Sequence, residues 1–342
     1  MDQNYRMSAF KGAVYFPSRA YNAYQTYEYF DADEIDRDFS YAQKAGISAL
    51  RIFTSFEQYE KGPGSFFDKF DALLSAAERH SVSVMPILFE NCGRDFTIEA
   101  AMDRDPDTAV CVKSPSLATI QHPDRWEPCL AFVEAFMRRY GDDARLVAIE
   151  VMNEPEYGIG DVDFALAMLR RAREFKKSVP LSIGCVSIEQ CLYYGDLIDV
   201  YQFHDNFPTT REAFKKKLDF ASSVKAVTGK PVWISEWQRL RVSGPGWNQA
   251  VIPEGDKCPD LASLADLVYS SGLGSFFWCL MVKPAYLSTQ RPNGTFNGLF
   301  HEDGSVYSLE DYKAVSGKDD VTVRKELPSW FIEERKRKEA DR

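Results

Sequence analysis

The stretch VSVMPILF at residues 82–89 is apolar at every position but one. A run of this kind is typical of a parallel β-strand whose two faces are both covered by other elements. The residues before it follow a different pattern, in which apolar side chains recur at helical spacing at Phe66, Phe70, Leu73, Leu74 and Ala77. This spacing predicts an amphipathic helix that packs against the strand, which is the repeating unit of an α/β sheet.

The same alternation continues in both directions along the chain. Further strands are predicted at residues 13–16, 48–53, 146–152, 181–185, 197–203, 232–235 and 275–280. Further helical segments are predicted at residues 34–45, 126–137, 164–176, 188–194, 211–225, 261–270 and 309–315. Eight strand–helix units in one series favour a closed parallel barrel over an open doubly wound sheet. The predicted fold class is therefore α/β, as a single (β/α)₈ TIM barrel.

The domain organisation follows from the absence of an internal linker. No Pro-, Gly- or Ser-rich segment divides the chain, so residues 1–320 are predicted to form one barrel domain. Residues 321–342 are predicted to form a charged tail, because the basic run at 335–338 is flanked by glutamates at 333, 334 and 339. Such mixed charge is typical of a solvated helix.

The composition excludes several classes of function. A net charge of −10 argues against a nucleic-acid-binding protein, which needs a basic patch on its surface. No apolar run is long enough to cross a membrane. The seven cysteines show no CxxC spacing, and the histidines at 80, 122, 204 and 301 form no HxH or HExxH motif. We therefore expect no metal and no cofactor. The N-terminus shows no signal sequence, which predicts a cytoplasmic protein, or a secreted one if a signal was removed. The oligomeric state stays open.

Two of the predicted strands carry a glutamate at the tip. The stretch AIEVMNEP at residues 148–155 places Glu154 at the tip of strand four, and the stretch VWISEW at 232–237 places Glu236 at the tip of strand seven. Active sites of barrels lie at the carboxyl ends of the strands, so both side chains are predicted to face one cleft. Retaining glycoside hydrolysis uses two carboxyl groups about 5 Å apart, one protonated and one ionised.

These motifs resemble the clan A glycoside hydrolases, and most of all the family 5 group of cellulases and mannanases. The resemblance covers nearly the whole predicted barrel. Besides the Asn-Glu-Pro tip of strand four and Glu236, it rests on Arg51 in the second strand, His204 at the end of the sixth and Trp278 in the eighth. It also includes the motifs GLF at 298–300 and DG at 303–304.

The resemblance implies a role for each matched residue. Glu154 would be the catalytic acid/base and Glu236 the nucleophile. Asn153 would bind the 2-hydroxyl of the reacting sugar, Arg51 would orient and ionise Glu236, and Trp278 would form the floor of the subsite for that sugar.

Two departures from the family pattern leave the exact family and the substrate open. The tyrosine that usually lies two residues after the strand-six histidine, beside the nucleophile, is replaced by Asn206. The histidine usual near the end of strand three is also missing, and the region has the sequence FENC at residues 89–92. Within it, Glu90 either contacts substrate or caps a helix.

Some positions allow a structural role beside the functional one. His204 is either a sugar contact or a buried core histidine, and Trp278 is either the subsite floor or core packing. Arg51 is a candidate partner of the deeper Glu150, a role that competes with contact to Glu236. Aromatic residues on loops of the same face are candidates for stacking on sugar rings: Phe16, Tyr21, Tyr157, Trp237, Trp247 and Tyr286.

The predicted function is hydrolysis of β-linked oligo- or polysaccharides, of β-mannan or β-glucan type, with retention through a covalent glycosyl-enzyme. The partner is thus a carbohydrate substrate. Two alternatives remain at this point. One is a transglycosylase that uses the same intermediate, and the other is a non-catalytic carbohydrate-binding barrel.

Overall fold

A computed structural model describes residues 9–156, 160–244, 251–286, 291 and 294–340. Its main feature is an eight-stranded, wholly parallel sheet with the order β5-β4-β3-β2-β1-β8-β7-β6. The strands are β1 (Lys11–Tyr15), β2 (Ala49–Phe53), β3 (Ser83–Glu90), β4 (Ile149–Asn153), β5 (Leu181–Gly184), β6 (Tyr201–Asp205), β7 (Val232–Trp237) and β8 (Gly274–Phe277). A small antiparallel pair joins β9 (Lys283–Pro284) to β10 (Phe296–Asn297).

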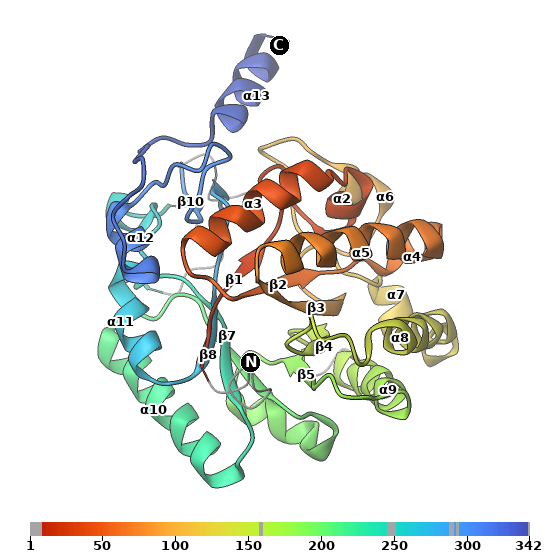
Figure 1. Cartoon of the computed structure of the whole chain (residues 1–342). Helices are drawn as coiled ribbons and strands as arrows, with labels where there is room; N and C mark the ends of the chain where they lie inside the picture. The colour runs from red at the N-terminus through yellow and green to blue at the C-terminus, as the bar shows by residue number, and fades with distance from the viewer. Residues whose placement is uncertain (1–8, 157–159, 245–250, 287–290, 292–293, 341–342) are drawn as a thin grey trace.

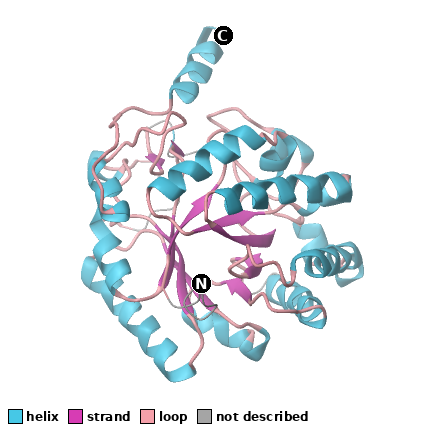
Figure 2. Cartoon of the chain, in the orientation of Figure 1, coloured by secondary structure: helices cyan, strands magenta, loops and turns pink. Residues whose placement is uncertain are grey.

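Helices surround the sheet on its outer side (Figures 1 and 2). The α-helices are α2 (Ala23–Glu28), α3 (Ala32–Lys44), α4 (Phe56–Lys61), α5 (Pro63–Arg79), α6 (Ile98–Met102), α7 (Leu117–Ile120), α8 (Glu127–Tyr140), α9 (Asp161–Glu174), α10 (Arg211–Thr228), α11 (Ala262–Ser270), α12 (Leu309–Ser316) and α13 (Ser329–Ala340). Short 3₁₀ helices are η1 (Pro123–Arg125), η2 (Ile188–Tyr193), η3 (Gly195–Leu197) and η4 (Glu254–Asp256).

The two edge strands approach each other and nearly close the barrel. The backbone N–H of Asp199 donates to Leu181 O at 2.8 Å, and the hydroxyl of Ser182 donates to Val200 O at 2.8 Å. These bonds occupy polar groups that an open sheet edge would leave unpaired. The predicted (β/α)₈ barrel is confirmed. Its fifth unit departs from the pattern, because η2 and η3 stand where the other units carry an α-helix.

Local sequence signals set the ends of the helices. In α10 the hydroxyl of Thr210 accepts from the backbone N–H of Ala213 at 3.1 Å, which caps the first turn. The helix ends at Gly229, whose φ of +70° favours glycine over residues with a Cβ.

Two large apolar clusters hold the fold together. One fills the inside of the barrel and includes Val14, Met85, Trp233 and Phe276. The other lies between the strands and the surrounding helices and contains most of the buried apolar residues. Both faces of the strands are therefore apolar, which explains why β3 carries the continuous apolar run of a doubly covered strand.

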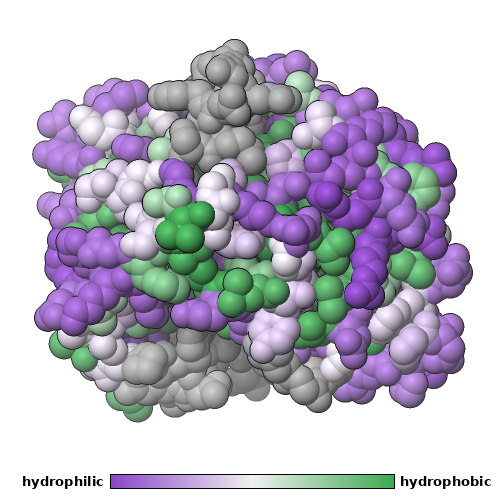
Figure 3. All heavy atoms as spheres, turned by 90° about the horizontal axis from the view of Figure 1, so that it is seen from below, coloured by the Kyte–Doolittle hydropathy of each residue, from purple (hydrophilic) through white to green (hydrophobic). Residues whose placement is uncertain are grey.

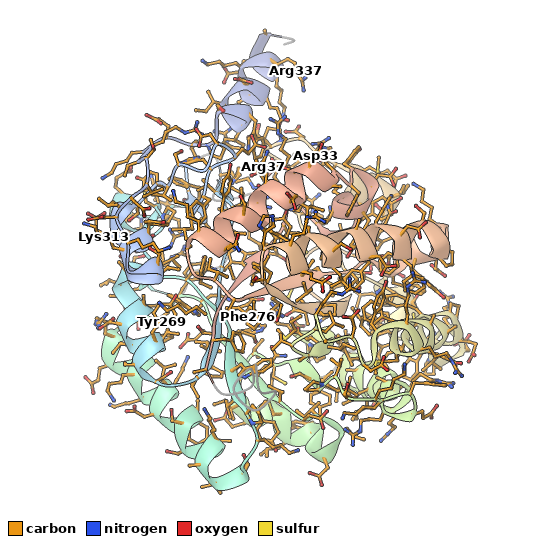
Figure 4. All side chains as sticks on the ribbon, viewed as in Figure 1. Asp33, Arg37, Tyr269, Phe276, Lys313 and Arg337 are labelled. Atoms are coloured by element: carbon orange, nitrogen blue, oxygen red, sulfur yellow. The ribbon has the colours of Figure 1, made fainter. Side chains whose placement is uncertain are left out.

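The C-terminal helix α13 stands at one edge of the molecule (Figure 1). Its side chains Trp330 and Phe331 are buried, and Arg335 pairs with Asp107 at 2.8 Å. Arg337 is exposed, in the last turns of the helix (Figure 4). The mixed charge of this segment predicted a solvated helix. The helix is instead partly covered, because one side of it has partners on the loop that follows β3.

The surface gives no sign of a membrane segment within the described ranges. None of their helices combines the length and the apolar content needed to span a bilayer. Seen from below, the described surface is largely polar, with apolar side chains in separate patches (Figure 3).

Candidate active site

A cavity of about 230 Å³ lies at the carboxyl ends of the strands. Its walls come from β2, β3, β4 and β7 and from the segments that follow β3, β4, β6, β7 and β8. The lining residues are Phe53, Glu90, Cys92, Asn153, Glu154, Asn206, Phe207, Glu236, Gln238, Arg241, Trp278, Ala285, Tyr286 and Asn297. Most of the residues predicted for the site therefore border one space, on the barrel face where active sites are found.

An irregularity in β4 brings Asn153 and Glu154 into this cavity. Between Glu150 and Asn153 the strand carries one residue more than β5 does between their pairing partners. The extra residue breaks the strict alternation, so Glu150 and Asn153 both point inward while Met152 joins the outer apolar cluster. Glu154 follows with a φ of +46°, a conformation that is uncommon for a residue with a Cβ and that clusters at functional sites.

A similar irregularity in β7 positions Glu236. One residue, Ser235, is inserted between the pairs that Ile234 and Glu236 make with β6. Trp233 lies inside the barrel, and strict alternation would then place Glu236, three positions later, on the outside. The inserted residue instead turns Glu236 towards the cavity.

The same geometry rules out the predicted role of Trp237. Its side chain is fully buried in the outer cluster, with ring centroids 5.9 Å from Tyr269 on α11 and 6.1 Å from Phe277 on β8. Tyr269 is labelled in Figure 4. Because consecutive strand residues point to opposite faces, an inward Glu236 forces Trp237 outward. The prediction that Trp237 binds substrate is wrong.

Arg51 is the hub of the polar network beneath the cavity. Its Nε donates to Glu150 Oε2 at 2.8 Å, its Nη2 donates to Glu150 Oε1 and to Asn153 Oδ1, and its Nη1 donates to Glu236 Oε1 at 2.6 Å. Gly184 leaves room for this pair, since a Cβ there would lie 2.1 Å from Glu150 Oε1. The structural and functional roles considered for Arg51 therefore coexist. Burial lowers the pKa of Arg51, but Glu150 and Glu236 outweigh it and raise the pKa above its usual value.

Replacing Arg51 with methionine is expected to lower the free energy of unfolding by about 3–5 kcal/mol, because it leaves Glu150 buried without its partner. Chemical denaturation measures this change. The matched control is Arg138→Met, which breaks an exposed pair with Glu134 and is expected to cost about 0.3–0.5 kcal/mol. Equal losses in the two variants would contradict the assignment of Arg51 as the hub.

Glu236 receives a donor at each carboxylate oxygen. Arg51 serves Oε1, and Asn206 Nδ2 donates to Oε2 at 2.9 Å. Asn206 is itself held by Gln238, whose Nε2 donates to its Oδ1 at 2.9 Å. The asparagine at the position of the family tyrosine thus makes a direct contact with the carboxylate.

Glu154 has a different set of partners. Its Oε1 accepts from His204 Nδ1, and its Oε2 accepts from the thiol of Cys92 at 3.0 Å. Burial raises the pKa of Glu154, but the hydrogen bond and charge of His204, with the Cys92 thiol and Arg51, outweigh it and lower the pKa below its usual value. Burial lowers the pKa of His204, but Glu236 and Glu154 hold it above its usual value. Both shifts favour the ion pair of Glu154 and His204 over its neutral form.

The two strand-tip glutamates converge in the structure. One oxygen each of Glu154 and Glu236, and one ring nitrogen of His204, lie within 4.8 Å of one another. Such a cluster has the donor types of a cation site. Here, however, Arg51 donates to Glu236 and His204 to Glu154, so both carboxylates already have cationic partners.

Glu90 lies beside these groups and is buried. It accepts from Asn153 Nδ2 at 2.9 Å and from the backbone N–H of Cys92 at 2.6 Å, so it holds Asn153 and the start of the following loop. Burial raises the pKa of Glu90 to about 8. The amide of Asn153 is held at both ends, because its Oδ1 accepts from Arg51 and its Nδ2 also lies 3.5 Å from Cys92 Sγ.

Replacing Glu90 with glutamine is expected to flatten the dependence of stability on pH. The folded state keeps the Glu90 proton up to about pH 8, whereas the unfolded chain releases it near pH 4.5, so the wild type loses stability as pH rises between these values. Glutamine removes this contribution, which amounts to up to roughly 3–4 kcal/mol between pH 5 and pH 8. Urea unfolding at pH 5 and at pH 8 measures this difference in stability, with Glu189→Gln as an exposed control. An unchanged slope in the Glu90 variant would contradict the buried, protonated state.

Aromatic side chains form one wall of the cavity. Trp278 and Tyr286 both line it and meet edge to face, with ring centroids 5.9 Å apart. Phe16 packs behind Trp278 at 6.1 Å. The candidate stacking residues Tyr157 and Trp247 lie outside the described residues.

Comparisons with known proteins place the fold. Solved structures similar to the chain include GH5_18 from Streptomyces cattleya, in complex with GlcNAc, at 14% identity and a TM-score of 0.61 over 93% of this chain and 83% of that one. An endo-1,4-β-D-mannanase from Thermotoga petrophila RKU-1 matches at 15% identity and a TM-score of 0.58, over 90% and 98%. A glycoside hydrolase family 5 mannosidase from Rhizomucor miehei matches at 14% and 0.57, over 91% and 92%.

The chain has the barrel fold of the family 5 glycoside hydrolases. The resemblance that the sequence motifs indicated is thus confirmed for the fold. Identities of 14–15% establish the fold alone. No protein-family model matches the sequence, and a search of curated proteins finds no match.

Within this family 5 fold, sequence reasoning missed seven residues of the cavity wall, among them Cys92, Gln238 and Arg241. Cys92, Gln238 and Arg241 lie just beyond the ends of β3 and β7, in segments that the sequence already placed at the active face. A polar residue within five positions of a strand end is a signal that could have found them, although many such residues only face solvent.

Proposed function

We propose that the protein is a retaining β-glycosidase that hydrolyses β-linked oligo- or polysaccharides. The observation that carries the proposal is the pair Glu154 and Glu236, whose carboxylate oxygens approach within 4.8 Å in one cavity with different partners. A separation near 5 Å suits a direct attack on the sugar, whereas inverting enzymes need a wider gap that admits a water molecule.

In the proposed first step Glu236 attacks the anomeric carbon and forms a covalent glycosyl-enzyme. Arg51 and Asn206 hold its two oxygens, so the carboxylate is oriented before substrate binds. Asn153, fixed by Arg51 and Glu90, lies beside it as the candidate contact for the 2-hydroxyl of the reacting sugar.

Glu154 would give a proton to the leaving oxygen and later take one from water. In the resting structure this proton belongs to the pair of Glu154 and His204. A bound sugar displaces water from the cavity, and loss of water disfavours an ion pair relative to its neutral form. The proton then moves along the hydrogen bond to Glu154, which becomes the acid.

The substrate class rests on the neighbours and on the cavity wall. An endo-1,4-β-D-mannanase and a mannosidase share the fold, and the aromatic wall of Trp278 and Tyr286 offers an apolar surface for a sugar ring. We therefore propose a β-mannan or β-glucan type of substrate, bound with Trp278 beneath the reacting sugar.

The test is a hydrolysis screen on aryl β-glycosides and on β-mannan and β-glucan oligosaccharides, with chromatographic analysis of products. We expect at least one β-glycoside to be cleaved to free sugar by the wild type and none by Glu236→Gln. Glycan binding without cleavage across the whole panel would indicate a carbohydrate-binding barrel instead. Transfer products in place of free sugar would indicate a transglycosylase.

A further inference from the structure

Arg241 is a buried cation on the wall of the same cavity. It lies in the segment that continues β7 beyond Glu236, and its side chain is fully buried. Among the residues that the structure describes, none accepts a hydrogen bond from its Nε, Nη1 or Nη2. Its guanidinium lies over the ring of Phe207, 3.7 Å from the ring centroid. This contact covers one face of the planar group and leaves the N–H bonds at its edge unpaired.

Arg239, two residues before Arg241, is an arginine of the same segment with a structural role. Its Nη2 donates to Asn297 Oδ1 at 2.6 Å, and its Nη1 donates to the backbone oxygens of Cys258 and Phe296. Those bonds tie the loops after β7 and β8 together. Arg241 makes no comparable bond within the described ranges, although burying a charged group is unfavourable unless it is paired.

The charged groups below the cavity make no contact with Arg241. Glu150 and Glu236 share Arg51, and Glu154 pairs with His204. Arg241 forms no ion pair with a described residue. The charge of Asp256 acts to raise its pKa, but burial outweighs this and lowers the pKa, and Asp256 is not part of the cavity wall. Gln238 lines the same cavity and donates to Asn206, but its buried Oε1 has no described partner. Among the described residues, this wall thus presents guanidinium N–H groups of Arg241 without an acceptor and the side-chain oxygen of Gln238 without a donor.

We propose that the saccharide bound in this cavity carries an anionic substituent, a carboxylate or a sulfate or phosphate ester, that pairs with Arg241. The guanidinium fork matches the two oxygens of such a group, and Gln238 Oε1 would accept from a sugar hydroxyl nearby. A net charge of −10 disfavours a densely charged polymer, so the ligand carries a single charge or few. The inference rests on the proposed function and narrows its substrate class.

The first test compares matched ligands on the Glu236→Gln variant, in which turnover is blocked. The probes are methyl β-glucoside, methyl β-glucuronide and the 6-sulfate and 6-phosphate of methyl β-glucoside, with Kd measured by NMR titration. We expect at least one anionic probe to bind about tenfold or more tightly than the neutral probe. The three anionic probes distinguish carboxylate, sulfate and phosphate. Adding Arg241→Met should bring the ratio of affinities close to one, and Arg241→Lys should keep part of it.

The second test separates ligand binding from a structural role. Arg241→Met removes an unpaired buried charge, so the Tm in the absence of ligand should stay equal or rise, whereas Arg239→Met should lower it. Equal affinity for neutral and anionic probes, a preference that survives Arg241→Met, or a fall in Tm as large as that of Arg239→Met would each overturn the inference. Because binding is measured without turnover, an anionic preference in a protein that hydrolyses nothing would contradict only the proposed function.

Discussion

Glu236→Gly is expected to abolish turnover of β-glycosides, by at least about 10⁴-fold, and added azide is expected to restore part of it. The glycine removes the attacking carboxylate and leaves a space on the side from which Glu236 would approach the sugar. A small anion that fills this space attacks from the same side, so the product should be the α-glycosyl azide. Rates with and without azide, and an NMR spectrum of the product, test both parts.

The control for this variant is its folding. Glu236 bonds to Arg51 and Asn206, so its loss also disturbs the network below the cavity. Glu236→Gln keeps the shape of the side chain and should be equally inactive, but it should not respond to azide because no space is opened. A glycine variant that is folded and keeps near-wild-type rates would refute the role of Glu236.

Glu154→Ala is expected to lower kcat/KM by about 10²–10⁴-fold on glycosides with poor leaving groups. Aryl glycosides with good leaving groups need little protonation, so on these the first step should survive and release of the sugar should become slow. Azide can then take the place of water in the second step, and the product should be the β-glycosyl azide. A burst of released phenol followed by a slow steady state is the kinetic signature.

His204 provides a second check on Glu154. The alanine variant leaves His204 and Cys92 without their shared partner, so a structural loss has to be separated from a chemical one. Glu154→Gln keeps a side chain of the same shape between His204 and Cys92. Its activity should show the same dependence on the leaving group as that of Glu154→Ala. If both variants lost activity equally on all leaving groups, Glu154 would not be the acid.

The fold was predictable because its pattern is repeated and its strands are covered on both faces. Runs such as residues 82–89 are apolar throughout, and the helices before and after them carry an apolar stripe. The fifth unit is the exception, since the segment after β5 forms 3₁₀ turns where the pattern predicted a helix. The position of this unit in the series of eight strand–helix units was nevertheless predicted correctly.

The side-chain geometry of the site was only partly predictable. The extra residues in β4 and β7 leave no mark in the sequence, yet they decide that Asn153 and Glu236 face the cavity and that Trp237 does not. Arg51 was assigned to two competing partners, because a sequence does not show that one guanidinium can serve both. The contact between Cys92 and Glu154 joins residues far apart in the chain, so no local pattern points to it.

The most direct measurement of the central claim is the site of covalent trapping. A 2-deoxy-2-fluoro β-glycoside with a good leaving group, made from the sugar that the screen identifies, should slow release of the sugar and leave one fluoroglycosyl group on the protein. Mass spectrometry of the peptides is predicted to find this group on Glu236. A label on another residue, or hydrolysis that yields the α-anomer first with no label at all, would contradict the account.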